Sequence, residues 1–468
     1  SLAGARAVVL GLGRFGGGFG AARWLLEQGA EVLVTDRAAP ETLGEAPERL
    51  RELGARLVLG GHEGVDAAGA DLLVINPAVP LTAPLVVAAR AAGVRCTSEI
   101  GLLLERWPGP TLGVTGSNGK STTVTLAAAL LRAAGRDVRL GGNLGGSLLA
   151  ELDQARSDTV AVLELSSFML EALAPTGLGP DVAVVTNLTP NHLDRHGTME
   201  AYAEAKAAIL SRAGLAVLPA DDARILAWAP APGVVQERRL FGVLAGRAGW
   251  CAEADLAVDA GGHLVRPSEG STLQRVLDGG LLALPGIMNR VDLAAATLAV
   301  GGLIGEVEAE AALVAAAPAL ATPPHRLSVV TERDGVRWID DSVSTTPEST
   351  AASLAALDPA GDRVCLLIAG GHDKGLLPAP LLDAAERHAR FVLAVGAEGP
   401  RLAEALRARG QRVEDVRTVE AAVARAAELA APGEQVVLSP GYSSHDQFLN
   451  YEARAEAFVR AVRDLNPV

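Results

Sequence analysis

Residues 111–123 read TLGVTGSNGKSTT, and in this stretch a short apolar run changes abruptly into glycine, lysine and hydroxyl residues. The apolar run is typical of a strand, and the VTLAAALLRAAG that follows is typical of a helix. In such a turn, backbone N–H groups can surround phosphate oxygens, while Lys120 reaches the β- and γ-phosphates and Ser121 ligates Mg²⁺. The strict pattern has glycine in place of Val114, but the Gly119-Lys120-Ser121 core is intact. The stretch therefore predicts a P-loop in an α/β domain.

Lysine is rare in this chain. Of 41 lysine and arginine residues, the only lysines are Lys120, Lys206 and Lys374. A compact ammonium and a broad guanidinium are not interchangeable, so the retention of Lys120 favours a functional role over a structural one. Lys206 lies in AYAEAKAAIL, which predicts an ordinary helix. The simplest interpretation is a solvated surface lysine, but in this chain we would expect arginine at such a position.

The bulk composition limits the function classes. A chain of 468 residues is long enough for about three domains. Its net charge of −14 argues against a general affinity for nucleic acid or anionic membranes. We find no apolar run long enough to span a bilayer and no basic-then-apolar leader, and we expect a soluble cytoplasmic protein. The three cysteines are far apart, which favours buried thiols over disulfides or a zinc site.

Strand-like apolar runs alternate with alanine-rich helical segments along the whole chain, as in an α/β fold with mostly parallel sheets. We expect three domains, at residues 1–98, 99–322 and 323–468. The stretch around 240–284 predicts irregular β structure. Ligands of parallel sheets bind at the carboxyl ends of the strands, which is where the polar motifs of this chain fall.

A glycine pattern opens the chain. GLGRFG places Gly11, Gly13 and Gly16 between a predicted strand and a predicted helix, and Asp36 ends the next strand. This is the dinucleotide-binding fingerprint, in which backbone N–H groups approach a diphosphate. A tight turn without a ligand and an NAD site both remain open for this stretch alone.

Two further strands end in polar residues. VAVLELSS supplies Glu164, and DVAVVTNLTPNHLDRHG supplies His192. A carboxylate and an imidazole at neighbouring strand ends behind a P-loop suggest a Mg²⁺ site beside the γ-phosphate. Singly, Glu164 could be an ion-pair partner and His192 a helix cap, but their combination with the P-loop favours the metal site.

Seven motifs occur in an order that resembles the Mur ligase family: TGSNGKST, ELSSFMLE, TPNHLDRHG, AYAEAKAAIL, LPGIMNRVDLAAA, PPHR and SPGYSSHDQF. The resemblance covers nearly the whole chain. It implies a Rossmann-like first domain that binds the UDP of a sugar nucleotide rather than NAD. It also implies a central P-loop ATPase-type domain and a Rossmann-like C-terminal domain that binds glutamate and completes the ATP site.

The resemblance implies an ATP-dependent amide ligase in cytoplasmic peptidoglycan precursor synthesis. ATP would phosphorylate the terminal carboxylate of UDP-N-acetylmuramoyl-L-alanine to an acyl phosphate, because a carboxylate is a poor electrophile. The amine of glutamate, with D-glutamate favoured, would then displace phosphate. We expect a monomer that uses Mg²⁺ at two sites and neither binds nucleic acid nor inserts into membranes. More distant alternatives are an NAD-dependent oxidoreductase and a ligase like folylpolyglutamate synthetase.

The resemblance also assigns residues. The catalytic residues would be Lys120, Glu164, His192 and Lys206, with Ser121 and Glu164 at one Mg²⁺ and His192 at the second. Lys206 matches a lysine that CO₂ converts to a carbamate, a ligand of that second metal, and arginine could not form this adduct.

The remaining assignments are binding residues. Those for ATP are Gly116, Ser117, Asn118, Gly119, Lys120, Ser121, Thr122, Asn289, Asp292, Arg326 and Asp341. Those for the UDP substrate are Gly11, Leu12, Gly13, Arg14, Phe15, Thr35, Asp36, Arg37, Asn76 and Asn143. Those for glutamate are Lys374, Ser344, Thr345, Ser444 and Tyr451.

One departure from the family concerns the glutamate site. The chain reads DSVSTTP where many relatives have a lysine, so Val343 leaves a glutamate carboxylate without its expected cation. A buried anion without a cation is costly. We expect Lys374 and neighbouring hydroxyls to replace the charge. The departure also leaves L-glutamate open as the acceptor.

Lys374→Ala should therefore raise the KM for glutamate far more than the KM for ATP. Steady-state kinetics with each substrate varied in turn measure both constants. An unchanged glutamate KM would rule out Lys374 as the replacement cation.

Overall fold

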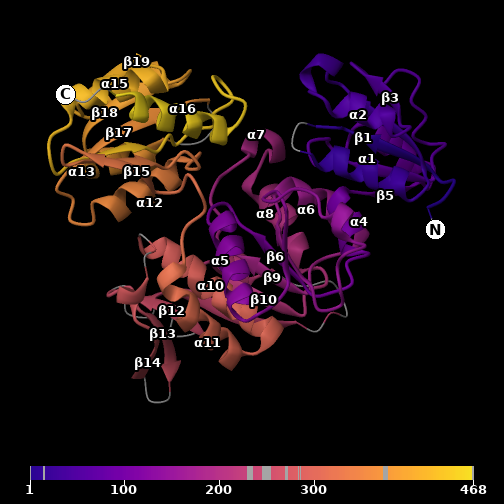
Figure 1. Ribbon diagram of the computed structural model, residues 1–468, viewed down its shortest axis with the longest axis horizontal. Coiled ribbons are helices and arrows are strands. Elements are labelled where there is room, and N and C mark those ends of the chain that lie inside the picture. Colours follow the sequence, from indigo (N-terminus) through magenta and orange to yellow (C-terminus); the bar gives the residue numbers. More distant parts are fainter. Residues whose placement is uncertain are drawn as a thin grey trace. The chain divides into compact units, whose positions relative to one another are not determined.

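The computed structural model describes residues 2–13, 16–228, 234, 236–244, 254–268, 272–282, 284, 286–372 and 378–465 (Figure 1). It contains three separate β-sheets, which occur one after another along the chain. Parallel strand pairs predominate in each sheet, which confirms the predicted α/β class with three successive sheet domains. The domain boundaries at 98 and 322 stay a prediction.

The first sheet is fully parallel, and its strand order β3-β2-β1-β4-β5 reverses direction beside β1. Such a reversal opens a crevice at the carboxyl ends of the strands, and the glycine loop follows β1 there. Its strands are β1 (Arg6–Leu10), β2 (Glu31–Asp36), β3 (Arg56–Leu59), β4 (Leu72–Ile75) and β5 (Arg95–Thr97). Its helices are α1 (Gly17–Glu27), α2 (Ala46–Glu52) and α3 (Pro84–Ala91), with α4 (Glu99–Leu104) following.

The second sheet has nine strands in the order β14-β13-β12-β11-β10-β9-β6-β8-β7. Its strands are β6 (Thr111–Thr115), β7 (Val138–Gly142), β8 (Val160–Glu164), β9 (Val182–Val185), β10 (Leu215–Pro219), β11 (Glu237–Leu244), β12 (Leu256–Asp259), β13 (Leu264–Ser268) and β14 (Thr272–Leu277). The associated helices are α5 (Lys120–Ala133), α6 (Ser167–Leu173), α7 (Leu193–His196), α8 (Met199–Ala207), α9 (Ala223–Leu226), α10 (Ile287–Ile304) and α11 (Glu306–Ala316).

The β structure expected around 240–284 is present as the strands β11 to β14. They continue the second sheet, first in parallel and then as antiparallel pairs, with an irregular register at Leu264 and Val265. Leu256, Ala257 and Val258 of β12 are buried, so apolar packing anchors this inner strand of the sheet.

The third sheet has the order β15-β16-β20-β17-β18-β19, with an antiparallel hairpin of β15 and β16 at one edge. Its strands are β15 (Ser328–Arg333), β16 (Val336–Asp340), β17 (Cys365–Gly370), β18 (Ala389–Val395), β19 (Val413–Arg417) and β20 (Gln435–Leu438). Its helices are α12 (Pro347–Leu357), α13 (Ala379–His388), α14 (Gly399–Ala408), α15 (Val419–Leu429) and α16 (Tyr451–Asp464). The 3₁₀ helices of the chain are η1 (Pro40–Thr42), η2 (Leu149–Glu151), η3 (Ala174–Thr176), η4 (Ala208–Leu210), η6 (Gly279–Leu281) and η7 (Ala317–Ala319).

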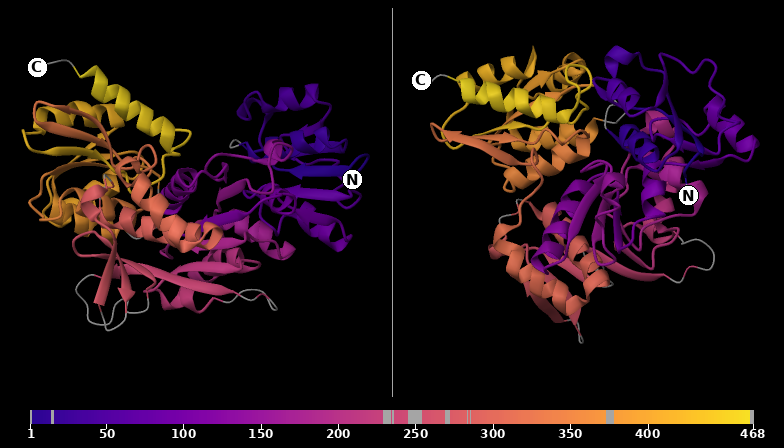
Figure 2. Two further views of the ribbon diagram at one scale, coloured as in Figure 1. Left: turned by 60° about the horizontal axis from the view of Figure 1, so that its bottom comes forward. Right: turned by 45° about the vertical axis from the view of Figure 1, so that its right-hand side comes forward.

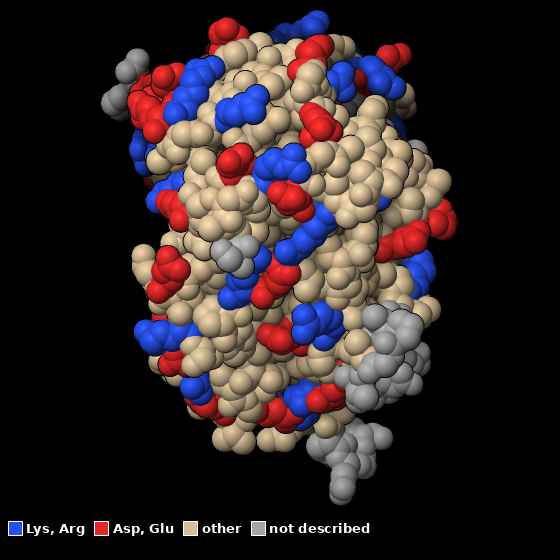
Figure 3. Space-filling view, turned by 90° about the vertical axis from the view of Figure 1, so that its right-hand side faces the viewer, with Lys and Arg blue, Asp and Glu red and all other residues tan. Residues whose placement is uncertain are grey.

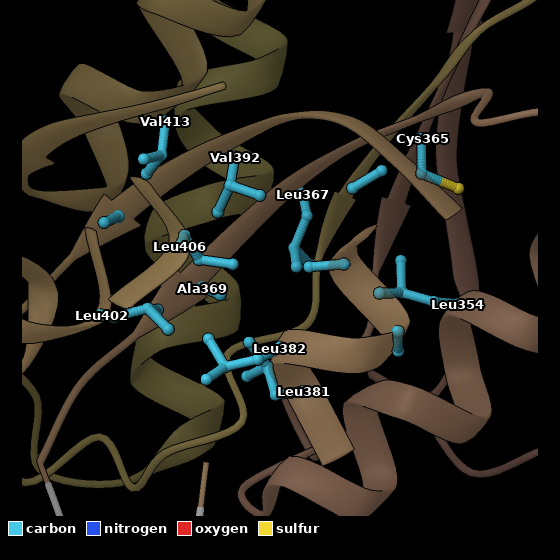
Figure 4. Packing of buried hydrophobic residues seen from close by; sticks show 14 of the residues in the cluster. Leu354, Cys365, Leu367, Ala369, Leu381, Leu382, Val392, Leu402, Leu406 and Val413 are labelled. Atoms are coloured by element: carbon cyan, nitrogen blue, oxygen red, sulfur yellow. The ribbon is translucent and has the colours of Figure 1, made fainter. Parts of the chain in front are cut away.

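Successive side chains of β17 point to opposite faces of the sheet, so the core of this domain has two layers. Leu367 and Ala369 pack with Leu381 of α13 and Leu402 of α14, and Figure 4 shows these side chains converging. The neighbouring Ile368 packs on the opposite face, against α15 and α16. Helices therefore cover both sides of the sheet, as Figure 2 shows from two further directions, and the strand is apolar throughout.

The chain separates into two compact units. The first comprises Ser1–Leu188, Ala203–Leu277 and Leu293–Ala317, and the second comprises Thr189–Tyr202, Asp278–Asp292 and Pro318–Val468. The first two sheets belong to the first unit and the third sheet to the second.

Among the described residues, α10 alone has the length and apolar composition of a membrane-crossing helix, and 67% of it is buried in the structure. The sequence analysis did not single it out because Arg290 and Asp292 interrupt its apolar run. Such burial is typical of a core helix.

The face in Figure 3 carries acidic and basic side chains interspersed, without a large patch of one sign.

A buried carboxylate begins α4, directly after the first sheet. Glu99 is 7% exposed, and Ser147 Oγ donates a hydrogen bond to its Oε1 at 2.5 Å. Burial raises the pKa of Glu99 from 4.5 to about 7, against the lowering effect of the Ser147 hydrogen bond. The folded chain therefore binds a proton that the unfolded chain releases between these pH values.

This predicts a pH dependence of stability. Proton binding by Glu99 contributes fully to the free energy of unfolding below pH 4.5. This contribution is lost as the pH rises toward about 7, and the loss amounts to up to about 3 kcal/mol. Glu99→Gln keeps a neutral side chain, so its melting temperature should fall less than that of the wild type between pH 4.5 and 8. Glu27→Gln, at an exposed ion pair with Arg23, is the matched control and should follow the wild type. Parallel melting curves for wild type and Glu99→Gln would contradict the assignment.

Candidate active site

The P-loop connects β6 to α5, and glycine is required at two of its positions. Gly116 has φ 149° and Gly119 has φ 82°, both in the region that side chains disfavour. A Cβ at Gly116 would lie 1.8 Å from Thr186 Oγ1, so the loop passes against the end of β9. Val114 is fully buried within β6, where it pairs in register with Glu164. The departure from the strict motif is therefore a strand residue and leaves the loop intact.

Asn187, which follows β9, fixes the P-loop from the side. Its Oδ1 accepts a hydrogen bond from Asn118 N at 3.0 Å, and its Nδ2 donates to Asn118 O at 3.0 Å. Its main-chain oxygen accepts from Ser117 N at 3.0 Å. The sequence analysis did not assign Asn187 to the site, since its spacing from the loop carries no signal of this contact.

Lys120 is the first residue of α5 and is half-buried. Its Nζ donates to the main-chain oxygens of Gly116 at 3.0 Å and Ser117 at 2.8 Å. The ammonium therefore lies over the P-loop, where phosphate oxygens would offer stronger, charge-assisted acceptors.

Glu164, at the end of β8, links the P-loop helix to the loop after β7. It is 2% exposed; Ser121 Oγ donates to its Oε2 at 2.6 Å, and Asn143 Nδ2 donates to its Oε1 at 2.7 Å. The structure thus brings together three residues that the sequence analysis assigned to the metal, ATP and sugar-nucleotide sites. A buried carboxylate beside a hydroxyl is a hard-oxygen donor set, which fits Mg²⁺.

Lys206 is enclosed at the end of α8 and is 1% exposed, so it is not a surface lysine. Its Nζ donates to Gly116 O at 2.7 Å and lies 3.3 Å from Thr115 Oγ1. Burial lowers its pKa well below the usual 10.5, nearby Lys120 lowers it further, and Glu164 acts in the opposite direction. The amine is therefore more readily neutral than an ordinary lysine.

His192 belongs to the second compact unit. It precedes α7 with φ 53°, a left-handed conformation that a non-glycine residue adopts at a cost of about 1–3 kcal/mol. Its N–H donates to Asn191 Oδ1 at 2.9 Å. Strain of this kind is typical of functional positions, which agrees with its predicted metal role.

In the first domain, Asp36 closes the glycine loop. Its Oδ2 accepts from Leu12 N at 2.8 Å and Gly13 N at 3.1 Å, and its Oδ1 accepts from Ala38 N at 2.8 Å. Asn76 lies against the same loop, 2.8 Å from the position that a Cβ at Gly11 would occupy.

The other residues assigned to the UDP substrate follow the strand ends. Thr35 is buried and contacts His62 Nδ1 at 2.8 Å, and Arg37 is exposed after β2. Arg14 and Phe15 lie outside the described residues. A cavity of about 190 Å³ beside the loop is lined by Gly13, Gly16, Phe19, Leu43, Ala46 and Arg49. The last four carry no motif, and the sequence analysis missed them.

The residues assigned to the ATP base and ribose lie in the second compact unit. Asn289 and Asp292 are buried at the start of α10. Asp341 is fully buried, its carboxylate accepts from Leu327 N at 3.2 Å and Ser439 Oγ at 2.7 Å, and burial raises its pKa. Arg326 Nε is buried and has no hydrogen-bond partner within the described residues. Asp341 thus already has partners within its domain, whereas Arg326 retains a free donor.

Three loops at the carboxyl ends of β16, β20 and β17 carry the residues assigned to glutamate. Gly441 N donates to Ser344 O at 2.9 Å, and His372 and Ser443 exchange main-chain hydrogen bonds. The loops are therefore joined, and Lys374 itself lies outside the described residues.

The individual side chains differ in accessibility. Ser344 is buried, with its Oγ 3.5 Å from Ser353 Oγ, so it faces the domain interior. Ser444 is also buried, and Thr345 and Val343 are half-buried. Tyr451 begins α16 and meets His325 edge-on, with ring centroids 6.4 Å apart.

Three family models match successive parts of the chain. Residues 5–98 match the Mur ligase MurD-like N-terminal domain, residues 114–265 the Mur ligase middle domain, and residues 325–441 the Mur ligase glutamate ligase domain. Among solved structures, UDP-N-acetylmuramate-alanine ligase MurC from Thermotoga maritima aligns with a TM-score of 0.58 at 17% identity, covering 98% of this chain and 99% of that one. That likeness concerns the fold.

Two relatives are similar over their whole length, and both are named UDP-N-acetylmuramoylalanine–D-glutamate ligase. The one from Roseiflexus sp. is 40% identical over 98% of this chain and 99% of its own. The one from Symbiobacterium thermophilum is 36% identical over 98% of each chain. The chain therefore belongs to the Mur ligase family.

Proposed function

We propose that this protein joins glutamate to UDP-N-acetylmuramoyl-L-alanine at the expense of ATP, in the cytoplasmic synthesis of peptidoglycan precursors. The observation that carries the proposal is the buried Glu164, which Ser121 of the P-loop helix and Asn143 of the neighbouring loop both contact. This arrangement would couple the proposed nucleotide site to the proposed sugar-nucleotide site. The full-length similarity to ligases named for this activity supports it.

The residues of the candidate site would have separate roles in the reaction. The P-loop amides and Lys120 would bind the triphosphate and offset the charge that develops on the transferred phosphoryl group. Ser121 and Glu164 would hold Mg²⁺, which neutralises phosphate charge when bound. Asn143 would position the carboxylate-bearing end of the sugar nucleotide. We further infer that the enzyme acts as a monomer.

Lys206 would act as a carbamate. A neutral amine nitrogen forms a bond to the carbon of CO₂ and releases one proton, which leaves an anionic carboxylate-like group. The burial and lowered pKa of Lys206 favour the neutral form that this reaction needs. The carbamate would offset the local positive charge of Lys120 and supply an anionic oxygen ligand for a second Mg²⁺.

The direct test is phosphate release from ATP with UDP-N-acetylmuramoyl-L-alanine and either D- or L-glutamate. We expect release that requires all three substrates, with D-glutamate preferred. Glu164→Gln should lower the rate by about 10²-fold or more, because a metal and charge site loses its anion. Glu428→Gln, at an exposed side chain of α15, is the control and should match the wild type. Preference for L-glutamate would revise the acceptor, and absence of release with either would refute the proposed activity.

The carbamate is testable because the chain has so few lysines. In ¹³C NMR of protein equilibrated with ¹³C-bicarbonate, we expect a carbamate carbon signal in the wild type that is lost in Lys206→Arg, while any signal from the α-amino group is common to both. The variants Lys120→Arg and Lys374→Arg should retain the signal and thus control for the other two amines. Full phosphate release by Lys206→Arg, or carbamate signals in it identical to those of the wild type, would exclude the carbamate at this position.

A further inference from the structure

The side chain of Arg454 is buried completely in the C-terminal domain. It lies in α16, is 2% exposed, and is the largest of the fully buried side chains. Its Nη1 donates to Tyr442 O at 3.1 Å and its Nη2 to Ser342 O at 3.0 Å, while its Nε has no hydrogen-bond partner among the described residues. Burial of a guanidinium with an unsatisfied donor is costly, so its presence here needs a reason beyond packing.

The position of this guanidinium supplies such a reason, because it donates to two loops and lies close to a third. Ser342 belongs to the loop after β16 and Tyr442 to the loop after β20. Gly371 belongs to the loop after β17, and a Cβ built on it would lie 3.3 Å from Nη1 of Arg454. These strands are neighbours in the sheet, so their carboxyl ends meet at one edge.

The charge of Arg454 persists at neutral pH. Burial lowers its pKa to about 10, whereas Asp446 and Asp340 act to raise it. Both carboxylates act on Arg454 only through their charge, and they accept hydrogen bonds elsewhere, Asp446 from Ala397 N and Asp340 from Ser342 N. A buried cation thus lies beneath the loop that contains Val343, where the family resemblance implies a lysine.

We propose that Arg454 is a positioning residue for the amino-acid substrate, holding the three loops in the arrangement that binds the carboxylates of glutamate. This inference rests on the proposed ligase function. It differs from direct binding by Lys374, because Arg454 acts through the loop carbonyls that it holds and through its buried charge.

Arg454→Lys and Arg454→Met separate these contributions. Lysine keeps the charge but cannot hold two carbonyls with a planar fork, and methionine removes both. We expect the KM for glutamate to rise about tenfold in Arg454→Lys and more in Arg454→Met, since one partner of a buried charged contact is lost. The KM values for ATP and UDP-N-acetylmuramoyl-L-alanine should change less than about twofold if the loops bind only the amino acid. Arg460→Met, at an exposed position of α16, is the matched control and should leave all three constants unchanged.

The possible results of these measurements distinguish failure of the positioning role from failure of the proposed function. If Arg454→Met does not fold, as thermal melting would show, the Arg454→Lys constants decide the question. Unchanged glutamate KM in Arg454→Lys, or an equal rise of all three KM values with a lowered melting temperature, would reject the positioning role while the wild type remains active. A wild type without glutamate-dependent phosphate release would instead refute the proposed function on which the inference rests.

Discussion

The carboxylate of Glu164 is the constraint on which the candidate active site depends. Because it is buried, each of its oxygens needs a partner, and the two partners come from opposite sides. Ser121 ties it to the helix that starts at the P-loop, and Asn143 ties it to the loop after β7. The strand order places β8 between β6 and β7, so a single side chain at its end reaches both neighbours. The position of the site follows from that strand order and from the need to satisfy one buried anion.

Much of this architecture could be predicted because its signals are local. The P-loop lies within a dozen residues, and glycine is required there by backbone conformation and by the approach of Thr186. Lys206 was recognised as unusual only through the scarcity of lysine in the chain, and its burial confirms that it is not a solvated surface residue. Strong apolar strands likewise marked the three sheets.

The features that the sequence did not reveal depend on pairing between distant segments. Asn187 fixes the P-loop because β9 lies beside β6, and no residue spacing encodes that neighbourhood. In sequence, Arg454 resembles any of the 37 other arginines of the chain, and only the fold shows that it is buried among three loops. The stretch that forms β11 to β14 indicated β structure in sequence, but its place as an extension of the second sheet depends on pairing with β10.

The glycine loop of the first domain has a consequence for ligand choice. Its N–H groups at Leu12 and Gly13 already donate to the carboxylate of Asp36. A phosphate at the same amides would have to displace that fixed anion and would meet its repulsion. The diphosphate of a sugar nucleotide would therefore need donors other than these two amides, while the Asp36 carboxylate keeps the loop in its turn.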